Sequence, residues 1–450
     1  MHRYLNLHAL TTYSGVLLVR DANDRPKELP YGTALRTMLS PQTQRRAQRT
    51  HLREAASTGR GPLAGYGFGI RTREWALLAA QALTSRGWES AEAKALAKEA
   101  LQALGLNFGT TERTQDLTKV LIFAPEDSGE NLAAVLDSRQ DELRPWLADI
   151  TTARAARQDS KSKKKTAGEP ATGDKTLLLA LPKQVKKELL AALAPADAID
   201  IALFGRCLTE IPESSEVDGA VQTMPAITVA RAAVCDDFYS AADDAKLRRR
   251  ATTPRPITSA LDFIAPPATA SPDVPDDRGS GMTGYQSLTS GTFYSHTVLD
   301  RVQLRTNLTR AGMAPEAAES AAQAAEAALI DAFCDAVPRA KQTTTAAPGT
   351  LPKLVLAFTD DRQHNYVACF EDALDETRAP ASLQAARTLL DHHDLITRKR
   401  GIDGGRILTY DLAITRLLQE RRDASQLKPT EVDTADQLAP AHPELAGQPA

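Results

Sequence analysis

Tyr4–Ala9, which reads YLNLHA, opens the chain with alternating polar and apolar side chains. A period of two predicts a half-buried β-strand, so we expect Leu5 and Leu7 to face a core and Asn6 and His8 to face outward. Helical patterns and further short apolar runs follow along the chain. Such a mixture of strands and helices predicts an α+β fold.

Other segments extend the mixture. Thr118–Phe123 and Leu354–Phe358 are short apolar runs that predict strands, and Ile199–Arg206 predicts an apolar strand that ends in a turn. Alanine and leucine recur at helical spacing across Glu89–Leu104 and Pro315–Val337, which predicts two helices.

Three stretches carry no such pattern. Residues 157–174 are polar and lysine-rich, and they predict a flexible loop. Six prolines in residues 251–281 predict an exposed excursion, because proline is excluded from helix interiors and central strands. A last helical stretch ends near Arg422, and residues 423–450 predict a disordered tail.

Composition narrows the class of protein. The 450 residues, of which 42% are hydrophobic, allow two or three compact units. No apolar stretch approaches the ~20 residues of a membrane span, and no signal peptide is expected, so we expect a cytoplasmic protein with no membrane partner. The four cysteines are scattered, which argues against disulfides and a zinc site. No phosphate-binding loop or catalytic signature occurs, so no enzyme activity, metal or cofactor is expected.

The strongest indication of function in the sequence is a cluster of basic residues near the N-terminus. Between Arg20 and Arg53 there are eight Lys/Arg residues against three acids. Ser40 followed by Pro41 predicts the start of a helix, with the Ser40 side chain accepting an unpaired backbone N–H. This helix carries a basic ridge formed by Arg45, Arg46, Arg49 and Arg53. Arginines at this spacing, with Gln42 near the helix start, favour phosphate binding over an ordinary solvated surface.

Several blocks, in this order, resemble one known family. They are Leu5–Leu10 (LNLHAL), Ile199–Arg206 (IDIALFGR), Val217–Ala220 (VDGA), Ser290–Tyr294 (SGTFY) and Val337–Gln342 (VPRAKQ). The sequence is similar to the CasC family, the backbone subunit of type I-E CRISPR surveillance complexes (Cascade).

The resemblance implies a modified ferredoxin-like, RNA-recognition-type palm with an inserted helical fingers domain and a thumb hairpin. The implied boundaries are 1–60, 199–235 and 291–422 for the palm, 61–198 for the fingers with the loop 157–174, 236–290 for the thumb with the insertion 251–281, and 423–450 for the tail.

The resemblance also implies a non-catalytic role: copies of the chain line up along guide RNA (crRNA) with other Cascade subunits and support R-loop formation on target DNA. The implied RNA-binding residues are Arg20, Lys27, Ser40, Gln42, Arg45, Arg46, Arg49, Arg206, Cys207, Phe238 and Tyr239. Two alternatives stay open. One is a metal-dependent endoribonuclease acting through Asp21 or Asp24 on target RNA, and the other is an assembly protein without an RNA role.

Overall fold

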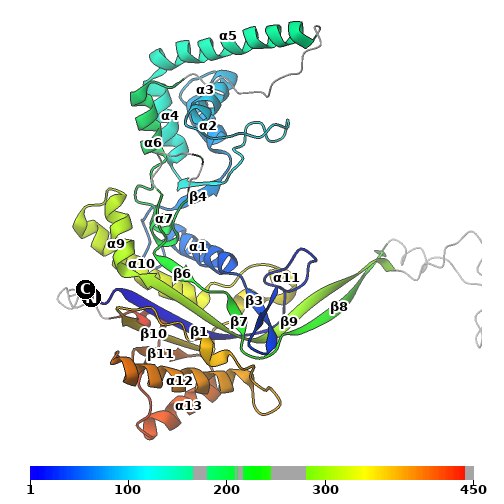
Figure 1. Cartoon of the computed structure of the whole chain (residues 1–450), viewed down its shortest axis with the longest axis vertical. Helices are drawn as coiled ribbons and strands as arrows, with labels where there is room; N and C mark the ends of the chain where they lie inside the picture. The colour runs from blue at the N-terminus through cyan, green and yellow to red at the C-terminus, as the bar shows by residue number, and fades with distance from the viewer. Residues whose placement is uncertain (166–179, 208–209, 211–215, 245–279, 441–450) are drawn as a thin grey trace, which may run out of the picture.

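A large central sheet and a separate group of helices make up the chain in the computed structural model, which describes residues 1–165, 180–207, 210, 216–244 and 280–440 (Figure 1). The predicted mixed α+β fold is confirmed, and the sheet is mostly antiparallel. Its strand order is β12-β11-β10-β1-β9-β7-β3-β2, while β6 and β8 also pair with β9. The strands are β1 (Tyr4–Val16), β2 (Glu28–Tyr31), β3 (Ala34–Leu39), β6 (Val221–Thr223), β7 (Ala226–Thr228), β8 (Ala233–Ala242), β9 (Ser280–Asp300), β10 (Leu354–Asp360), β11 (Arg406–Thr409) and β12 (Thr430–Glu431).

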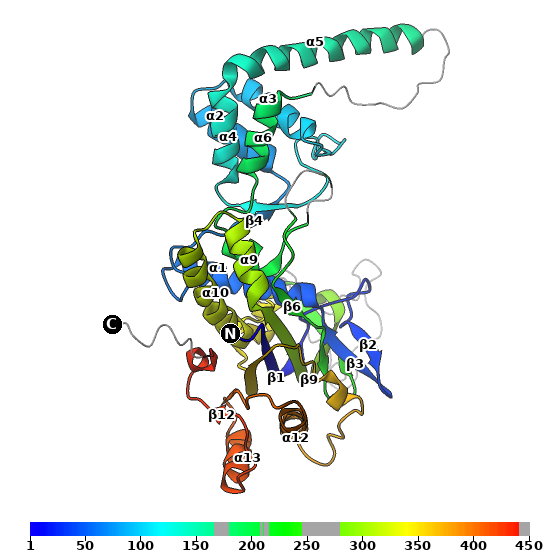
Figure 2. The ribbon, with the colours of Figure 1, turned by 60° about the vertical axis from the view of Figure 1, so that its left-hand side comes forward.

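Helices lie on both faces of this sheet and in the separate group (Figures 1 and 2). The α-helices of the described residues are α1 (Pro41–Ser57), α2 (Trp75–Ser85), α3 (Ser90–Ala103), α4 (Ser128–Ser138), α5 (Gln140–Lys165), α6 (Lys183–Ala192), α7 (Ile199–Phe204), α9 (Arg301–Arg310), α10 (Pro315–Asp335), α11 (Gln342–Thr345), α12 (Ala381–Arg400) and α13 (Leu412–Asp423). Short 3₁₀ turns are η2 (Ala347–Gly349), η3 (Val367–Phe370) and η4 (Ala435–Leu438).

Both faces of β1 are buried, which corrects the expectation that Asn6 and His8 face outward. Leu5 and Leu7 pack in one core with leucines and alanines of α9 and α10. His8 and Asn6 are fully buried as well, and the His8 ring stacks on Phe358 on the side covered by α12. The alternation predicted the strand, but the polar residues face a second packed layer rather than water because helices cover both sides.

The separate group of helices has a core of its own. Helices α2, α3, α4, α5 and α6 surround buried side chains such as Trp75 and Leu132. We call this group the helical unit. The two-stranded sheet of β4 (Gly69–Thr72) and β5 (Ile122–Pro125) lies at its base, so the strand predicted at Thr118–Phe123 begins four residues later than expected.

Ile199–Phe204 forms helix α7, not the predicted strand. All six side chains of this segment are buried. Its one charged residue, Asp200, is buried together with the apolar ones, so the run has no solvent-facing side and its sequence does not separate a buried helical turn from a strand. Gly205, at a φ of +76°, ends the helix, because a left-handed backbone is easiest for glycine.

Two of the segments that were predicted to be unstructured contain regular structure, so those predictions are partly wrong. Helix α5 extends through residues 157–165 of the predicted loop, because the lysine-rich sequence contains good helix formers; residues 166–174 lie outside the described part. In the predicted tail, Thr430–Glu431 forms β12 beside β11, and Leu438 is buried. The prolines predicted as an excursion, in residues 251–279, lie outside the described residues.

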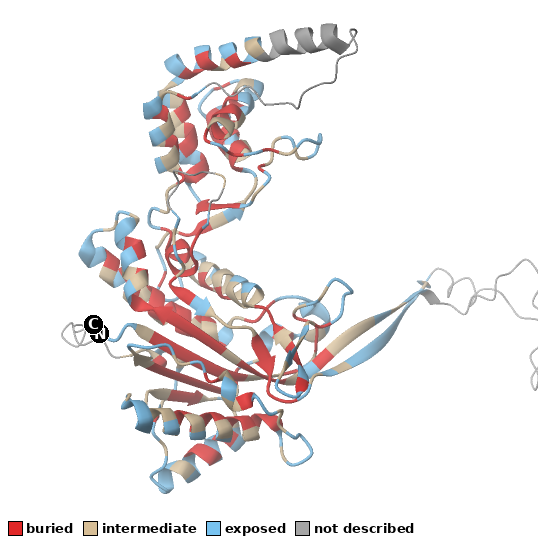
Figure 3. Cartoon of the chain, viewed as in Figure 1, coloured by how far each residue is buried: buried red, intermediate tan, exposed pale blue. Residues whose placement is uncertain are grey.

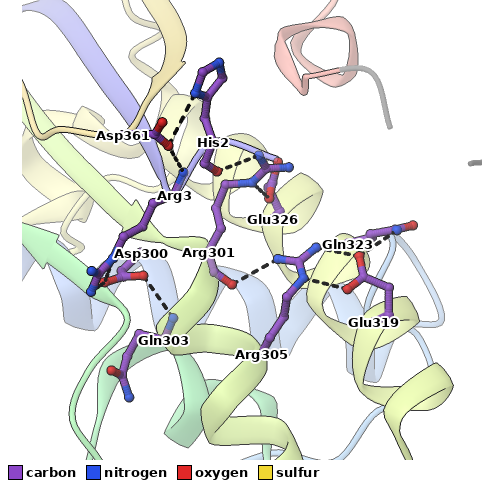
Figure 4. A network of polar contacts seen from close by, with 10 residues as sticks. All are labelled: His2, Arg3, Asp300, Arg301, Gln303, Arg305, Glu319, Gln323, Glu326 and Asp361. Atoms are coloured by element: carbon purple, nitrogen blue, oxygen red, sulfur yellow. Dashed lines mark hydrogen bonds and ion pairs between the residues drawn. The ribbon is translucent and has the colours of Figure 1, made fainter. Parts of the chain in front are cut away.

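A polar network joins the N-terminus to α9 and α10 (Figure 4). Arg3 pairs with Asp300 at 2.7 Å, and Arg301 pairs with Glu326 at 2.7 Å. The second pair is almost inaccessible, with side-chain exposures of 5% and 1%. Because each buried charge depends on its partner, this pair fixes α10 against the start of α9.

Candidate nucleic-acid interface

Helix α1 occupies the space between the helical unit and the central sheet (Figures 1 and 2). It begins at Ser40–Pro41, as the sequence predicts. The Gln44 amide fixes this start by donating to the carbonyls of Leu39 and Met224, both at 3.0 Å. Leu52 is buried against the rest of the chain. The helix therefore presents its arginines from a rigid support.

The start of α1 differs from the prediction in one detail. The Ser40 hydroxyl does not cap the helix; it lies 2.9 Å from the Thr43 hydroxyl. Gln42 is exposed in the first turn. Lys27 is close to this point, because its carbonyl accepts the backbone N–H of Met38 at 2.8 Å. Three of the predicted residues, Ser40, Gln42 and Lys27, are thus brought near one another.

Arg20 lies on the neighbouring loop, where its side chain is 61% exposed and pairs with Asp24 at 2.9 Å. Arg20 also forms an isolated bridge with Pro26, directly before Lys27. This loop carries the two aspartates of the nuclease alternative. Asp21 accepts backbone N–H groups of Asn23 and Arg25, and these bonds lower its pKa.

Three arginines of α1 meet a fourth from the helical unit's base. The group consists of Arg45, Arg49, Arg53 and Arg71, and we call it the basic cluster. Arg49 and Arg71 both lie over the Phe123 ring, at 4.8 and 5.2 Å from its centre. Arg45 donates to the Phe204 carbonyl and lies 5.6 Å from the centre of that ring. Aromatic faces stabilise guanidinium groups that stand close to one another.

One member of the basic cluster, Arg53, forms an ion pair with Glu126 at 3.4 Å, whereas Arg45, Arg49 and Arg71 have no ion pair with any residue that the structure describes. Burial lowers the pKa of Arg45 and of Arg49, and repulsion from Arg71 adds to both shifts. Asp200 is the nearby buried acid, and burial raises its pKa to about 6 in spite of a bond from the Gly69 N–H. Like charges held together in this way favour binding of a polyanion, which would relieve their repulsion.

The ridge predicted from sequence is therefore divided between two faces of α1. Arg45, Arg49 and Arg53 belong to the basic cluster, whereas Arg46 is exposed on another face and lines a cavity. Sequence analysis missed Arg71 and Phe123, which are distant in the chain. No local pattern marks them, since only the pairing of β4 with β5 places Arg71 opposite Phe123.

Arg206 does not fit its expected role. Its residue exposure is 5%, and its guanidinium donates to the carbonyls of Leu193 and Phe123. Burial lowers its pKa to about 10. Arg36, counted within the basic stretch, is likewise fully buried and bonded to backbone carbonyls. We therefore remove Arg206 from the candidate site, because a guanidinium that fastens interior carbonyls is not accessible to RNA.

Cys207, by contrast, is exposed just after Arg206, with its Sγ 3.7 Å from a Glu216 carboxylate oxygen. It lies at the end of the segment that continues α7. The structure gives it an accessible position beside the junction of the helical unit and the sheet, with no contact to the basic cluster among the bonds of the described residues.

Phe238 and Tyr239 lie far from α1, on the hairpin of β8 and β9. The hairpin extends beyond the sheet, and its outer part is largely exposed (Figures 1 and 3). Phe238 is 55% exposed and stands opposite Tyr285, which is 76% exposed, with ring centres 5.2 Å apart. One chain therefore does not bring these aromatic side chains to its own arginines.

Comparison with solved structures finds this fold in chains of CRISPR surveillance complexes. A chain of a "CRISPR RNA-guided surveillance complex, pre-nicking" is similar at a TM-score of 0.70 and 25% identity, with 97% of each chain covered. A chain of a "CRISPR RNA-guided surveillance complex" shows the same fold at a TM-score of 0.62 and 22% identity, again with 97% of each covered.

The sequence itself belongs to the family of CT1975-like proteins, which matches residues 5–259 and 269–417. No curated protein matches the chain. In the part that the structure describes, no helix combines the length and the apolar character that crossing a membrane requires.

Proposed function

We propose that this chain is a non-catalytic guide-RNA-binding backbone subunit of a type I-E CRISPR surveillance complex, of the CasC type. The basic cluster is the observation that carries the proposal, because four arginines share one site and, in the part of the chain that the structure describes, only Arg53 among them has an ion pair. The similarity to chains of RNA-guided surveillance complexes supports guide RNA (crRNA) as the polyanion and other Cascade subunits as partners.

In this proposal the central sheet is the palm, with a modified ferredoxin-like organisation, and the helical unit is the fingers. The β8–β9 hairpin is the thumb. The exposed side chains of Phe238 and Tyr239, with Tyr285 opposite Phe238, then contact RNA held on an adjacent copy, since they cannot reach the α1 of their own chain. Successive copies form a filament along the RNA, and base pairing by the guide selects target DNA while the protein holds the backbone.

The nuclease alternative gains no support from geometry. Asp24 forms an ion pair with Arg20, and the Asp21 carboxylate accepts hydrogen bonds from backbone N–H groups of its own loop. Among the described residues, no three His, Cys, Asp or Glu side chains gather as metal ligands would. Cytoplasmic location remains part of the proposal.

Arg45→Ala combined with Arg49→Ala tests the proposal. Removal of two phosphate contacts from single-stranded RNA should lower the slope of log affinity against log salt by about 1.4, because each contact contributes roughly 0.7. Affinity at low salt should fall by about tenfold for each lost contact. The loss should be the same for unrelated RNA sequences, since no base is read.

The matched control is Arg139→Ala combined with Arg144→Ala. It removes the same number of positive charges from the helical unit, where Arg139 forms an ion pair with Glu188 and Arg144 lies 4.5 Å from the centre of the Trp88 ring. Thermal melting of both variants separates lost binding from lost folding. Equal affinities and equal salt slopes in the two double variants would refute the proposed RNA site.

A further inference from the structure

Asp200 is a buried carboxyl group beside the basic cluster, in the first turn of α7, and only 1% of the residue is exposed. One of its oxygens, Oδ1, accepts the backbone N–H of Gly69 at 2.7 Å. The other oxygen, Oδ2, is buried and has no hydrogen-bond partner among the residues that the structure describes. A buried carboxylate with an unpaired oxygen is costly in its charged form, so its protonation state depends on the charges around it.

Tight packing holds this carboxyl group in place. Gly69 lies so close to β5 and α7 that a Cβ atom there would stand 2.7 Å from the Phe123 ring and 3.0 Å from the Ile201 side chain. Because glycine has no side chain, its N–H can approach Asp200 directly. The carboxyl group is therefore fixed by backbone and apolar side chains rather than by flexible polar ones.

Arg49 and Arg53 of α1 supply the positive charge that faces Asp200. Arg53 donates to the Gly69 carbonyl at 2.8 Å, and Arg49 lies 4.8 Å from the centre of the Phe123 ring. The charge of both arginines favours the ionised carboxyl group, yet no donor of the described residues reaches Oδ2. The two arginines thus act on Asp200 through space, and they are members of the basic cluster.

The other groups around α7 are apolar, uncharged or directed elsewhere. Helices α9 and α10 meet its apolar side chains, and Asn307 of α9 donates its uncharged amide to a carbonyl of α7 at 2.8 Å. Glu126, just after β5, pairs with Arg53, and Asp197, just before α7, is exposed. The ionised form of Asp200 therefore depends on Arg49 and Arg53.

Phosphate groups at the basic cluster would remove that support. Without RNA, burial outweighs the two arginines and raises the pKa of Asp200 to about 6. Bound phosphates repel the carboxylate, and they also neutralise the arginines that favour its charge. Both effects raise the pKa of Asp200 further in the complex, because each one disfavours the ionised form.

We propose that Asp200 takes up a proton from solvent when RNA binds the basic cluster, so that RNA binding strengthens as the pH falls. The proton bonds to Oδ2, the carboxyl group becomes neutral, and the Gly69 N–H keeps its bond to Oδ1. The positive charge of the cluster then acts on the phosphates without opposition from Asp200. This inference rests on the proposed function, which assigns RNA to the cluster, and it adds regulation of that site by pH.

The size of the effect follows from linkage. A group whose pKa rises on binding strengthens binding as the pH falls through that range. For one phosphate near the carboxylate, affinity for single-stranded RNA should rise by roughly fourfold from about pH 7.5 to about pH 6. Calorimetry in two buffers of different ionisation enthalpy counts the protons directly, and Asp200 should contribute about half a proton per bound chain at about pH 6.5.

Asp200→Asn keeps an oxygen for the Gly69 N–H but cannot take up the proton. At about pH 7.5 it should bind RNA at least as tightly as the wild type binds at about pH 6, and its proton uptake should be smaller by about half a proton. Asp197→Asn is the matched control, because it removes a nearby but exposed carboxylate. The control should take up as many protons as the wild type.

Thermal melting at both pH values establishes that the variants are folded. If Asp200→Asn does not fold, carboxyl-carbon NMR of the ¹³C-aspartate-labelled wild type replaces it: one signal that titrates near pH 6 should move to higher pH with RNA, and no movement would overturn the inference. RNA binding without proton uptake, or equal uptake in Asp200→Asn and the wild type, would also overturn it and leave the salt-slope test standing. No RNA binding by the wild type at either pH would refute the proposed function and this inference together.

Discussion

Acidification should destabilise this protein, because the central sheet buries neutral histidines. The His8 ring is fully buried and stacks on His296, with ring centres 4.6 Å apart. Its Nδ1 lies 2.9 Å from the Tyr294 hydroxyl. Burial holds the pKa of His8 well below its usual value and lowers the pKa of His296 to about 4, with nearby His364 adding to the second shift. Burial also lowers the pKa of His393.

The sign and size follow from the two states of His296. In the unfolded chain its pKa returns to about 6.5, so the unfolded state binds a proton that the folded state refuses. Stability is therefore unaffected above about pH 6.5 and falls as the pH drops from there toward about 4. At about pH 5.5 the cost from this one group is roughly 1.4 kcal/mol. His8 and His393 shift in the same direction and add to the loss.

Denaturant unfolding at about pH 7.5 and about pH 5.5 measures this loss. His296→Phe keeps a flat ring in the stack but cannot bind a proton, so it should lose roughly 1.4 kcal/mol less than the wild type over that interval. His2→Phe is the control, because its side chain is 54% exposed. Identical pH dependence in the wild type and His296→Phe would refute the reasoning.

Two further predictions concern the buried ion pair and the hairpin. Arg301→Ala or Glu326→Ala should each lower the free energy of unfolding by about 3–5 kcal/mol, since each removes the oppositely charged group that lies 2.7 Å from a buried charge. Arg301→Met with Glu326→Leu should recover most of that loss in the same denaturant assay, and a double variant that is less stable than both single ones would contradict this. Phe238→Ala with Tyr285→Ala should change stability by no more than about 0.5 kcal/mol, because both side chains are exposed. Sedimentation should nevertheless show smaller RNA-bound assemblies, and assemblies of unchanged size would exclude the hairpin from contact between copies.

Local patterns predicted the elements that carry a clear period or start signal. Ser40–Pro41 marked the start of α1, and the alanine-rich run from Pro315 marked α10. The segment Ile199–Phe204 was assigned to the wrong element because it is buried on every side, which erases the difference between periods. The alternating pattern predicts that Asn6 and His8 are exposed, but both are buried because a second layer of helices covers their face of the sheet.

Only the part of the candidate site that lies on one continuous segment, helix α1, is predictable from the sequence. The arginines of α1 follow from spacing, but their division between two faces depends on what packs against the helix. Arg206 looked equivalent to them in sequence, yet its position beneath the helical unit makes it structural. Arg71 joins the site through the pairing of β4 with β5, which periodicity cannot supply.

The most direct test of the central claim is the mass of the protein on RNA of increasing length. With its companion subunits supplied at low ionic strength, the chain should bind guide RNA in a number of copies that rises in proportion to RNA length, as measured by analytical ultracentrifugation. A chain that stays monomeric and leaves RNA of every length unbound under those conditions would contradict the account.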